Sequence, residues 1–258
     1  MPGSQPYENL HPLSMFSGCF NISDTEKFHK AIKLLQESTN NTPLFIGDNI
    51  ITWNRNLSFL RDDFFRNFLS SNQVTDIEKS CVWRLYILLY FADSCKNING
   101  DYVELGCHKG TTAKFVTDKI DFQGLNKHYW LYDLFSWNEG DEHSHMPGHD
   151  NPRMYEDVIE RFKAKPYVSI IRGSVPDSLK QGFPSKIAFA HIDMNHPDPE
   201  SGALERVLPC LSPGGIIVFD DYGWWGYSGQ KKALDPIAKR YGLEILELPT
   251  GQGLLIKH

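Results

Sequence analysis

The stretch Val103-Glu104-Leu105-Gly106-Cys107-His108-Lys109-Gly110 decides the fold of this chain. A short apolar run ends at Leu105 and a glycine follows directly, which is typical of a buried strand that turns tightly into a helix. In such a turn we expect glycine backbone to approach a ligand closely and the helix start to offer free N–H groups. Glu104 would stand at the turn, able to accept hydrogen bonds from an amine or a hydroxyl group.

The glycine spacing differs from that of a dinucleotide-binding site, which has glycines at its first, third and sixth places. Counted from Gly106, the third place is His108, so a pyrophosphate would meet a side chain where bare backbone is required. By itself the stretch also fits an ordinary turn with a surface glutamate. The rest of the chain has to distinguish these interpretations.

Composition limits the class of protein. The chain has 258 residues, of which 41% are hydrophobic, and this suits one large domain or a domain with an extension. The net charge of −6 argues against nucleic-acid binding. The longest apolar run, within residues 82–92, contains Arg84 and is too short for a membrane span, and no signal peptide is visible after Met1. Five scattered cysteines without a Cys-x-x-Cys pair favour reduced thiols in a cytoplasmic protein.

Residues 1–98 are expected to form an N-terminal arm and a helical cap. Residues 1–25 are rich in Pro, Ser, Gly and Asn, which is typical of irregular structure. Apolar residues then recur at helical spacing. This spacing predicts helices over residues 24–37, 56–71 and 76–95.

Residues 99–258 are expected to form an α/β domain with a doubly wound, mostly parallel sheet of seven strands. Short apolar runs alternate there with amphipathic stretches, as in parallel strands buried on both faces. The last two runs are joined only by residues 249–253, too few for a parallel crossover, so the sheet should end in an antiparallel hairpin. The expected strands are residues 101–105, 128–133, 167–172, 187–193, 215–220, 243–248 and 254–257, and the expected helices are 110–120, 152–164, 199–210 and 229–241.

Acidic residues stand at the ends of four of these strands. Glu104, Asp133, Asp193 and the pair Asp220-Asp221 fall at carboxyl ends, where ligands of open α/β sheets bind. Each could cap a helix, but together they would repel one another unless cations share the cleft. Asp133 stands where a carboxylate takes both hydroxyls of a ribose. The three aspartates Asp193, Asp220 and Asp221 offer hard oxygen ligands that suit Mg²⁺ or Ca²⁺.

These stretches resemble the class I S-adenosylmethionine-dependent methyltransferases, and more narrowly the macrocin O-methyltransferase group, which methylates hydroxyls of sugars and other natural products. The order and spacing of six matching stretches carry the resemblance. They are residues 103–110, 132–135, 172–179, 188–193, 211–215 and 220–223. The resemblance implies a Rossmann-like class I methyltransferase fold for residues 99–258 and, more loosely, a helical cap before it.

The resemblance also implies a set of ligands. Mg²⁺, or another hard divalent cation, would bind Asp193, Asp220 and Asp221. S-adenosylmethionine would lie along the turn after the first strand, with its adenine near Gly173 and Ser174. The implied cofactor-binding residues are Glu104, Gly106, Cys107, His108, Gly110, Thr111, Asp133, Leu134, Gly173, Ser174 and Asp193.

One residue departs from the family's pattern. The family has a second acid two places after its first metal-binding aspartate, and that acid is its expected base. Here Asn195 stands at that place, and a neutral amide cannot accept a proton at pH 7. His196, a metal-bound hydroxide or the metal alone could take over the deprotonation. We therefore place Asp193, Asn195 and His196 at the catalytic centre.

Two further clusters are open to more than one interpretation. The histidines of residues 139–151 suggest zinc, but without cysteines or regular spacing they fit a solvated, mobile loop better. The aromatic residues of 224–227 either pack in the core or cover the mouth of the site, where they would stack on a sugar or another planar acceptor.

The sequence thus predicts a Mg²⁺-dependent O-methyltransferase that transfers the methyl group of S-adenosylmethionine to a hydroxyl of a small-molecule acceptor. No nucleic-acid or membrane partner is expected, and a homo-oligomer is compatible with the pattern. Two alternatives stay open. One is a nucleotide-sugar oxidoreductase on a dinucleotide fold, and the other is a non-catalytic methyltransferase-like binding protein in which Asn195 marks lost chemistry.

Overall fold

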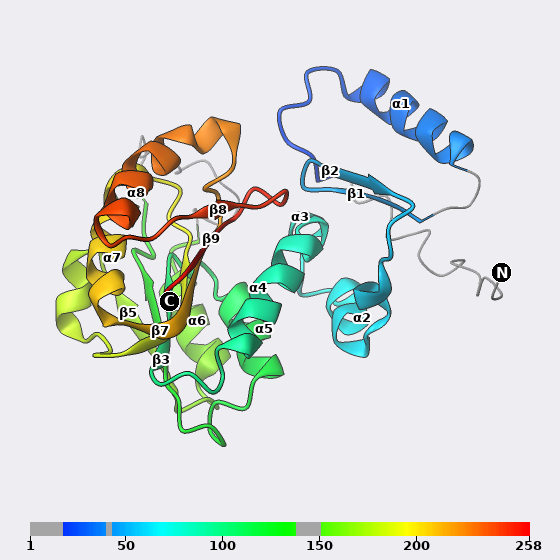
Figure 1. Cartoon of the computed structure of the whole chain (residues 1–258). Coiled ribbons are helices and arrows are strands. Elements are labelled where there is room, and N and C mark those ends of the chain that lie inside the picture. Colours follow the sequence, from blue (N-terminus) through cyan, green and yellow to red (C-terminus); the bar gives the residue numbers. More distant parts are fainter. Residues whose placement is uncertain (1–17, 40–42, 138–150) are drawn as a thin grey trace. The chain divides into compact units, whose positions relative to one another are not determined.

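The computed structural model describes residues 18–39, 43–137 and 151–258, which belong to two compact units (Figure 1). The units, Met1–Tyr86 and Ile87–His258, divide within helix α4 (Val82–Ser94) rather than after residue 98. Every helix in the described ranges is too short or too polar to cross a lipid bilayer.

The first unit contains a β-hairpin, so the cap is not purely helical. Strands β1 (Leu44–Gly47) and β2 (Ile50–Trp53) pair antiparallel. Asp48 and Asn49 join them with φ of 52° and 58°, the left-handed conformation that tight hairpin turns require. The Arg84 guanidinium donates to both carboxylate oxygens of buried Asp48, at 2.6 and 2.9 Å, which ties the hairpin to the start of α4.

The helices expected over residues 56–71 and 76–95 are each broken by a local cap or turn. Asp62 ends the first piece and starts the next, because its side chain accepts the Phe64 N–H at 2.8 Å. The second break falls at Cys81. The helices of this part of the chain are α1 (Thr25–Ser38), η3 (Ser58–Arg61), α2 (Asp63–Ser70), α3 (Asp76–Ser80) and α4.

A seven-stranded sheet forms the core of the second unit, in the order β5-β4-β3-β6-β7-β9-β8 over the described residues. Neighbours from β5 to β7 are parallel, whereas β9 is antiparallel to both β7 and β8, which confirms the doubly wound sheet with a reversed terminal hairpin. β7 begins earlier than expected, and β8 is only two residues long. The strands are β3 (Asp101–Leu105), β4 (Tyr129–Asp133), β5 (Val168–Arg172), β6 (Ile187–Ile192), β7 (Leu211–Phe219), β8 (Leu246–Glu247) and β9 (Gly253–Ile256).

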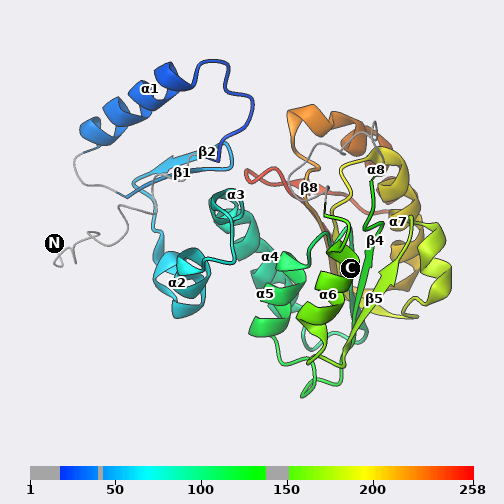
Figure 2. The same ribbon diagram turned by 180° about the vertical axis from the view of Figure 1, so that it is seen from behind.

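Helices cover both faces of this sheet, α7 and α8 on one side and α5 and α6 on the other (Figures 1 and 2). Val103 and Leu105 of β3 face the α7 and α8 side, where they belong to one apolar core with Leu204 and Leu234. Because side chains alternate along a strand, Glu104 faces the opposite side. The remaining helices are α5 (Thr111–Lys119), α6 (Met154–Phe162), η4 (Asp177–Gln181), α7 (Pro197–Cys210), η5 (Trp225–Tyr227) and α8 (Ser228–Arg240).

Candidate functional site

The strand ends bring the predicted acidic residues to one edge of the sheet. Backbone hydrogen bonds continue past the regular strands, because the Asp193 N–H donates to the Leu105 carbonyl (2.8 Å) and the Asp220 N–H donates to the Ile192 carbonyl (2.9 Å). The residues that follow β3, β6 and β7 are therefore held side by side. This is the carboxyl edge, where ligands of open α/β sheets bind.

The turn after β3 has an unusual backbone. Gly106, His108 and Gly110 all have positive φ, at 92°, 48° and 73°. The chain then enters α5, whose N-cap Gly110 has no side chain to cap the helix. A helix start of this kind can offer its first N–H groups to a negatively charged ligand.

Packing within the protein requires the two glycines of this turn. A Cβ on Gly106 would lie 1.7 Å from the Asp193 carbonyl oxygen, and a Cβ on Gly110 would lie 2.7 Å from the Phe162 ring. Gly106 thus lets the ends of β3 and β6 approach each other. Gly110 lets α6 pack against the turn.

Asp133 ends β4 and shapes the same turn. One carboxylate oxygen accepts the His108 N–H at 2.7 Å, and the other accepts the Phe135 N–H at 2.8 Å. Burial raises the pKa of Asp133, and these two N–H donors partly oppose the rise. Each oxygen has a further lone pair. The carboxylate could therefore still accept hydroxyl groups of a ribose.

Glu104 is buried beneath the turn, so it is not a surface glutamate. Its Oε2 accepts the Tyr129 hydroxyl at 2.9 Å, and its Oε1 lies 3.4 Å from Nδ1 of His191. Cys107 is buried as well. Its burial, together with the negative charges of Asp133 and Glu104, raises the pKa of the Cys107 thiol well above its usual value. This residue is therefore a neutral thiol rather than a nucleophile.

The other predicted cofactor residues surround the turn and the ends of β4 and β5. Thr111 is the first residue of α5, and Leu134, which follows Asp133, exposes 41% of its surface. Gly173 and Ser174 follow β5, and the Gly173 N–H donates to the Asp133 carbonyl at 2.9 Å. An exposed leucine beside a glycine turn is suited to contact a flat apolar ring.

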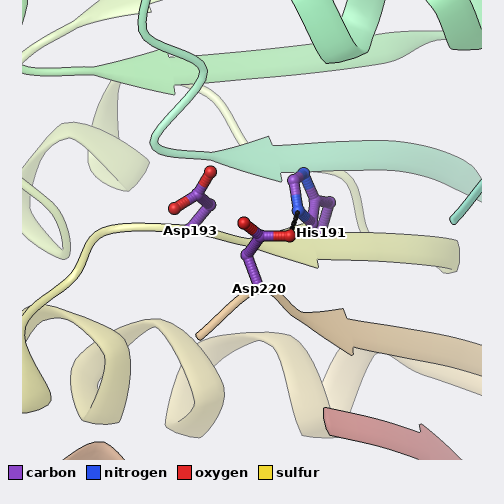
Figure 3. A group of neighbouring side chains, drawn as sticks. All are labelled: His191, Asp193 and Asp220. Atoms are coloured by element: carbon purple, nitrogen blue, oxygen red, sulfur yellow. Dashed lines mark ion pairs between the residues drawn. The ribbon is translucent and has the colours of Figure 1, made fainter. Parts of the chain in front are cut away.

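His191, Asp193 and Asp220 form a group that could hold a metal ion (Figure 3). One potential ligand atom of each lies within 4.8 Å of the others. Figure 3 also marks the ion pair between His191 Nε2 and Asp220 Oδ1, which are 3.6 Å apart. Burial alone would lower the pKa of His191, but the Asp220 and Glu104 carboxylates raise it well above its usual value. Two of the three predicted metal ligands are thus brought together.

Asp221, the third predicted ligand, is outside this group and influences another buried acid. Burial raises the pKa of Glu200 to about 8; the Met194 N–H opposes this rise and the negative charge of Asp221 adds to it. Glu200 accepts that N–H at 3.2 Å and the Gln230 side-chain amide at 2.9 Å. Glu200 therefore connects the loop after β6 with α7 and α8.

Asn195 and His196 lie in the loop between β6 and α7. Asn195 has a φ of 56°, a left-handed conformation that asparagine tolerates. His196 is the N-cap of α7, and its Nδ1 accepts the Asp198 N–H at 3.2 Å. A neutral imidazole that accepts at Nδ1 carries its proton on Nε2. This geometry favours helix capping over proton abstraction by His196.

The aromatic residues after Asp221 were expected either to pack in the core or to cover the mouth of the site, and the structure contains one of each kind. Trp224 packs on the terminal hairpin, since a Cβ on Gly251 would lie 2.3 Å from its indole Nε1. Trp225 is 93% exposed and could contact an acceptor. The histidine loop, with His143, His145 and His149, lies outside the described residues.

Three residues that lie against Glu104 or Asp220 were not anticipated from the sequence. They are His191, Tyr129 and Gln252, whose side-chain amide donates to Asp220 Oδ1 at 3.3 Å. For His191 a signal was present, because it precedes Asp193 by two residues on a strand and so faces the same side. In the sequence Tyr129 resembles an ordinary strand residue, and Gln252 lies in the expected turn of residues 249–253.

A known protein family matches the part of the chain that forms this site. The family described as "Methyltransferase domain" matches residues 103–222, from β3 to the loop that contains Asp220 and Asp221. A curated protein of Streptomyces olivaceus, 8-demethyl-8-(2,3-dimethoxy-alpha-L-rhamnosyl)-tetracenomycin-C 4'-O-methyltransferase, is 25% identical over 178 residues. That similarity covers 62% of this chain and 67% of the relative.

Solved structures share the fold. The O-methyltransferase NovP superimposes with a TM-score of 0.54 and 18% identity, over 71% of this chain and 81% of NovP. CalS11, a calicheamicin methyltransferase, superimposes with a TM-score of 0.55 and 15% identity, over 91% of this chain and 94% of CalS11. At these identities the likeness shows the fold alone, which is that of the class I methyltransferases.

Proposed function

We propose that this chain, a class I S-adenosylmethionine-dependent methyltransferase, transfers the cofactor's methyl group to a hydroxyl oxygen of a small sugar-like or natural-product acceptor. The meeting of the Asp193 and Asp220 carboxylates beside the turn of residues 106–110 carries this proposal. The names of two similar proteins support a deoxysugar acceptor. The Streptomyces olivaceus relative is named for a rhamnosyl compound, and a second CalS11 structure is described as a TDP-rhamnose 3'-O-methyltransferase.

The residues around the turn fit S-adenosylmethionine. Asp133 would accept the ribose hydroxyls, and Leu134 with Gly173 and Ser174 would contact the adenine. The start of α5 would face the negatively charged carboxylate of the methionine part. The sulfonium of this cofactor is already activated. The protein therefore has to position the acceptor and remove its proton.

The same edge fits a hard divalent cation such as Mg²⁺. Asp193 and Asp220 would hold the ion through carboxylate oxygens, which Mg²⁺ prefers, and Asp221 would be a further ligand. When bound, the ion would lower the pKa of the acceptor hydroxyl. Asn195 cannot accept the proton, and His196 is used as a helix cap. We therefore infer that deprotonation depends on the metal rather than on a side-chain base.

Asp133→Ala is expected to weaken binding of S-adenosylhomocysteine by about 1.5–3 kcal/mol, because charge-assisted bonds to the ribose are lost. Isothermal titration calorimetry measures the affinity of the variant and of the wild type for S-adenosylhomocysteine. Asp133→Asn keeps the size of the side chain and part of its contact with the His108 N–H. The affinity of this variant for S-adenosylhomocysteine should therefore lie between that of Asp133→Ala and that of the wild type. Unfolding curves of both variants show whether the turn is intact. Unchanged affinity in a folded Asp133→Ala protein would contradict the ribose assignment.

His196→Asn is expected to keep kcat near the wild-type value, because asparagine is also a good N-cap. His196→Ala should lose about 1 kcal/mol of stability through the lost cap. The kcat of both variants is measured with S-adenosylmethionine and TDP-rhamnose. If kcat instead falls by about 10²–10⁴ in both variants with cofactor binding intact, His196 is the base after all. Higher activity in Asn195→Asp would show that this position can still use an acid.

Mass spectrometry of the products tests the acceptor class. The protein is incubated with S-adenosylmethionine, Mg²⁺ and a panel of nucleotide sugars and glycosylated aromatics, with TDP-rhamnose included. We expect one added methyl group on a sugar hydroxyl. Cofactor binding without turnover across the whole panel would favour the binding-protein alternative. The oxidoreductase alternative is disfavoured by the methyltransferase-domain match and the reversed β8–β9 hairpin.

A further inference from the structure

His191 lies between the two halves of the site. Its strand, β6, is hydrogen-bonded to β3 on one side and to β7 on the other, and His191 stands opposite Glu104 in the pairing. The imidazole Nδ1 lies 3.4 Å from Glu104 Oε1, and Nε2 lies 3.6 Å from Asp220 Oδ1. His191 as a whole residue is only 1% exposed. Each nitrogen is thus directed to a carboxylate on a different neighbouring strand end.

These contacts belong to a longer series of polar side chains, which we call the polar row. At one end the Tyr129 hydroxyl donates to Glu104. At the other end Gln252 donates to Asp220 and accepts the Thr250 hydroxyl at 2.9 Å. The row crosses β4, β3, β6 and β7 to the start of β9, and its members are Tyr129, Glu104, His191, Asp220, Gln252 and Thr250.

We propose that His191 is a positioning residue for methyl transfer, which holds the Asp220 carboxylate in place and connects it to Glu104 beneath the cofactor turn. This rests on the proposed function, since Asp220 is there a metal ligand. An apolar side chain at this buried position would leave Glu104 and Asp220 facing a surface without a donor, which is costly. Imidazole is suited to the task because its two nitrogens point in divergent directions.

Two amide side chains at position 191, those of asparagine and glutamine, distinguish the contact with Glu104 from the contact with Asp220. The amide nitrogen of asparagine can occupy roughly the place of Nδ1, and that of glutamine the place of Nε2. His191→Gln should therefore keep a donor to Asp220, whereas His191→Asn keeps one only to Glu104. We expect His191→Asn to weaken Mg²⁺ binding by about 10–100-fold, the usual cost of losing a partner behind a metal ligand. His191→Gln should bind Mg²⁺ within about threefold of the wild type.

Calorimetry with MgCl2 and, separately, with S-adenosylhomocysteine gives the readouts. A merely structural role would lower both affinities in both variants, and equal Mg²⁺ affinity in His191→Asn and the wild type would overturn the proposal. Crystal structures without metal add an independent readout. They should show the Asp220 carboxylate displaced in His191→Asn and in its wild-type place in His191→Gln. An unmoved Asp220 in His191→Asn overturns the proposal, whereas absence of Mg²⁺ binding in the wild type overturns only the metal assignment.

A third variant serves if both replacements at position 191 fail to fold. Glu104→Gln keeps the shape of the side chain and its contact with Tyr129. Because Glu104 is outside the group that could hold the metal, it should change Mg²⁺ affinity only through His191. We expect a loss of about 3–10-fold, smaller than the 10–100-fold typical of a residue in contact with a metal ligand, because Glu104 acts through one more residue. Wild-type Mg²⁺ affinity in Glu104→Gln would contradict the connection.

Discussion

Replacing Asp220 with asparagine is expected to abolish Mg²⁺-dependent turnover while S-adenosylmethionine still binds. Asp193 and Asp220 contribute the two carboxylates of the group within 4.8 Å, so the substitution removes half of its negative charge. An outer partner of a metal typically contributes 10–100-fold in affinity, and a direct ligand should cost at least about 100-fold. Calorimetry with MgCl2 measures the affinity. A methylation assay with chelator, followed by excess Mg²⁺, measures the turnover.

Three further variants make this result specific. Asp198→Asn removes a carboxylate from an exposed position at the start of α7, and it should leave both metal affinity and turnover unchanged. Asp221→Asn separates the two candidate ligand sets. A loss as large as that of Asp220→Asn supports Asp221 as a third carboxylate ligand, whereas a small loss supports Asp193 and Asp220 as the carboxylates that hold the ion. A double variant of Asp220 and Asp221 that is fully active and indifferent to chelator would show that the metal mechanism is wrong.

The sheet could be predicted because each of its central strands can be recognised in the sequence by itself. Residues 101–105 were expected as a strand and form β3 over Asp101–Leu105. Central parallel strands are buried on both faces, so they appear as short apolar runs. The acids that end these runs were placed correctly at one edge, because parallel strands direct their carboxyl ends the same way.

The first unit was less predictable because its boundaries depend on local hydrogen bonds. In the β1–β2 hairpin, apolar and β-branched residues flank the pair Asp48-Asn49, and this pair is typical of a turn. Each strand has only four residues, so the alternation along it is too short to predict a strand. The break before α2 depends on one side chain, that of Asp62. Periodicity extends across such a break, because the apolar spacing continues on both sides of it.

The polar row could not be predicted because its contacts join residues far apart in the sequence. Glu104 and His191 meet only because β3 and β6 are neighbours, and Gln252 reaches Asp220 only because β9 pairs with β7. The sequence shows which residues face one side of a strand. It does not show the strand order, and the strand order decides which acids and bases become partners.

Gly106→Ala is expected to destabilise the second unit by about 2–5 kcal/mol or more. Alanine at a φ of 92° costs about 1–2 kcal/mol. Its Cβ would also lie 1.7 Å from the Asp193 carbonyl oxygen and 2.6 Å from the Asp193 carbonyl carbon, and overpacking of this kind typically adds 1–3 kcal/mol or more. Both atoms are backbone, so no side-chain rotation relieves the overlap. Chemical unfolding of the full chain measures the loss.

Two other glycines separate the cost of backbone conformation from the cost of the overlap. Gly242 has a φ of 70°, and a Cβ added to it would meet no heavy atom within 4 Å, so Gly242→Ala should cost only about 1–2 kcal/mol. Gly226 has the same open surroundings without a positive φ, and Gly226→Ala should stay within about 0.5 kcal/mol. If Gly106→Ala costs no more than Gly242→Ala, the close approach of β3 and β6 is wrong. If it costs more, Mg²⁺ affinity should fall with stability, since the displaced backbone belongs to Asp193.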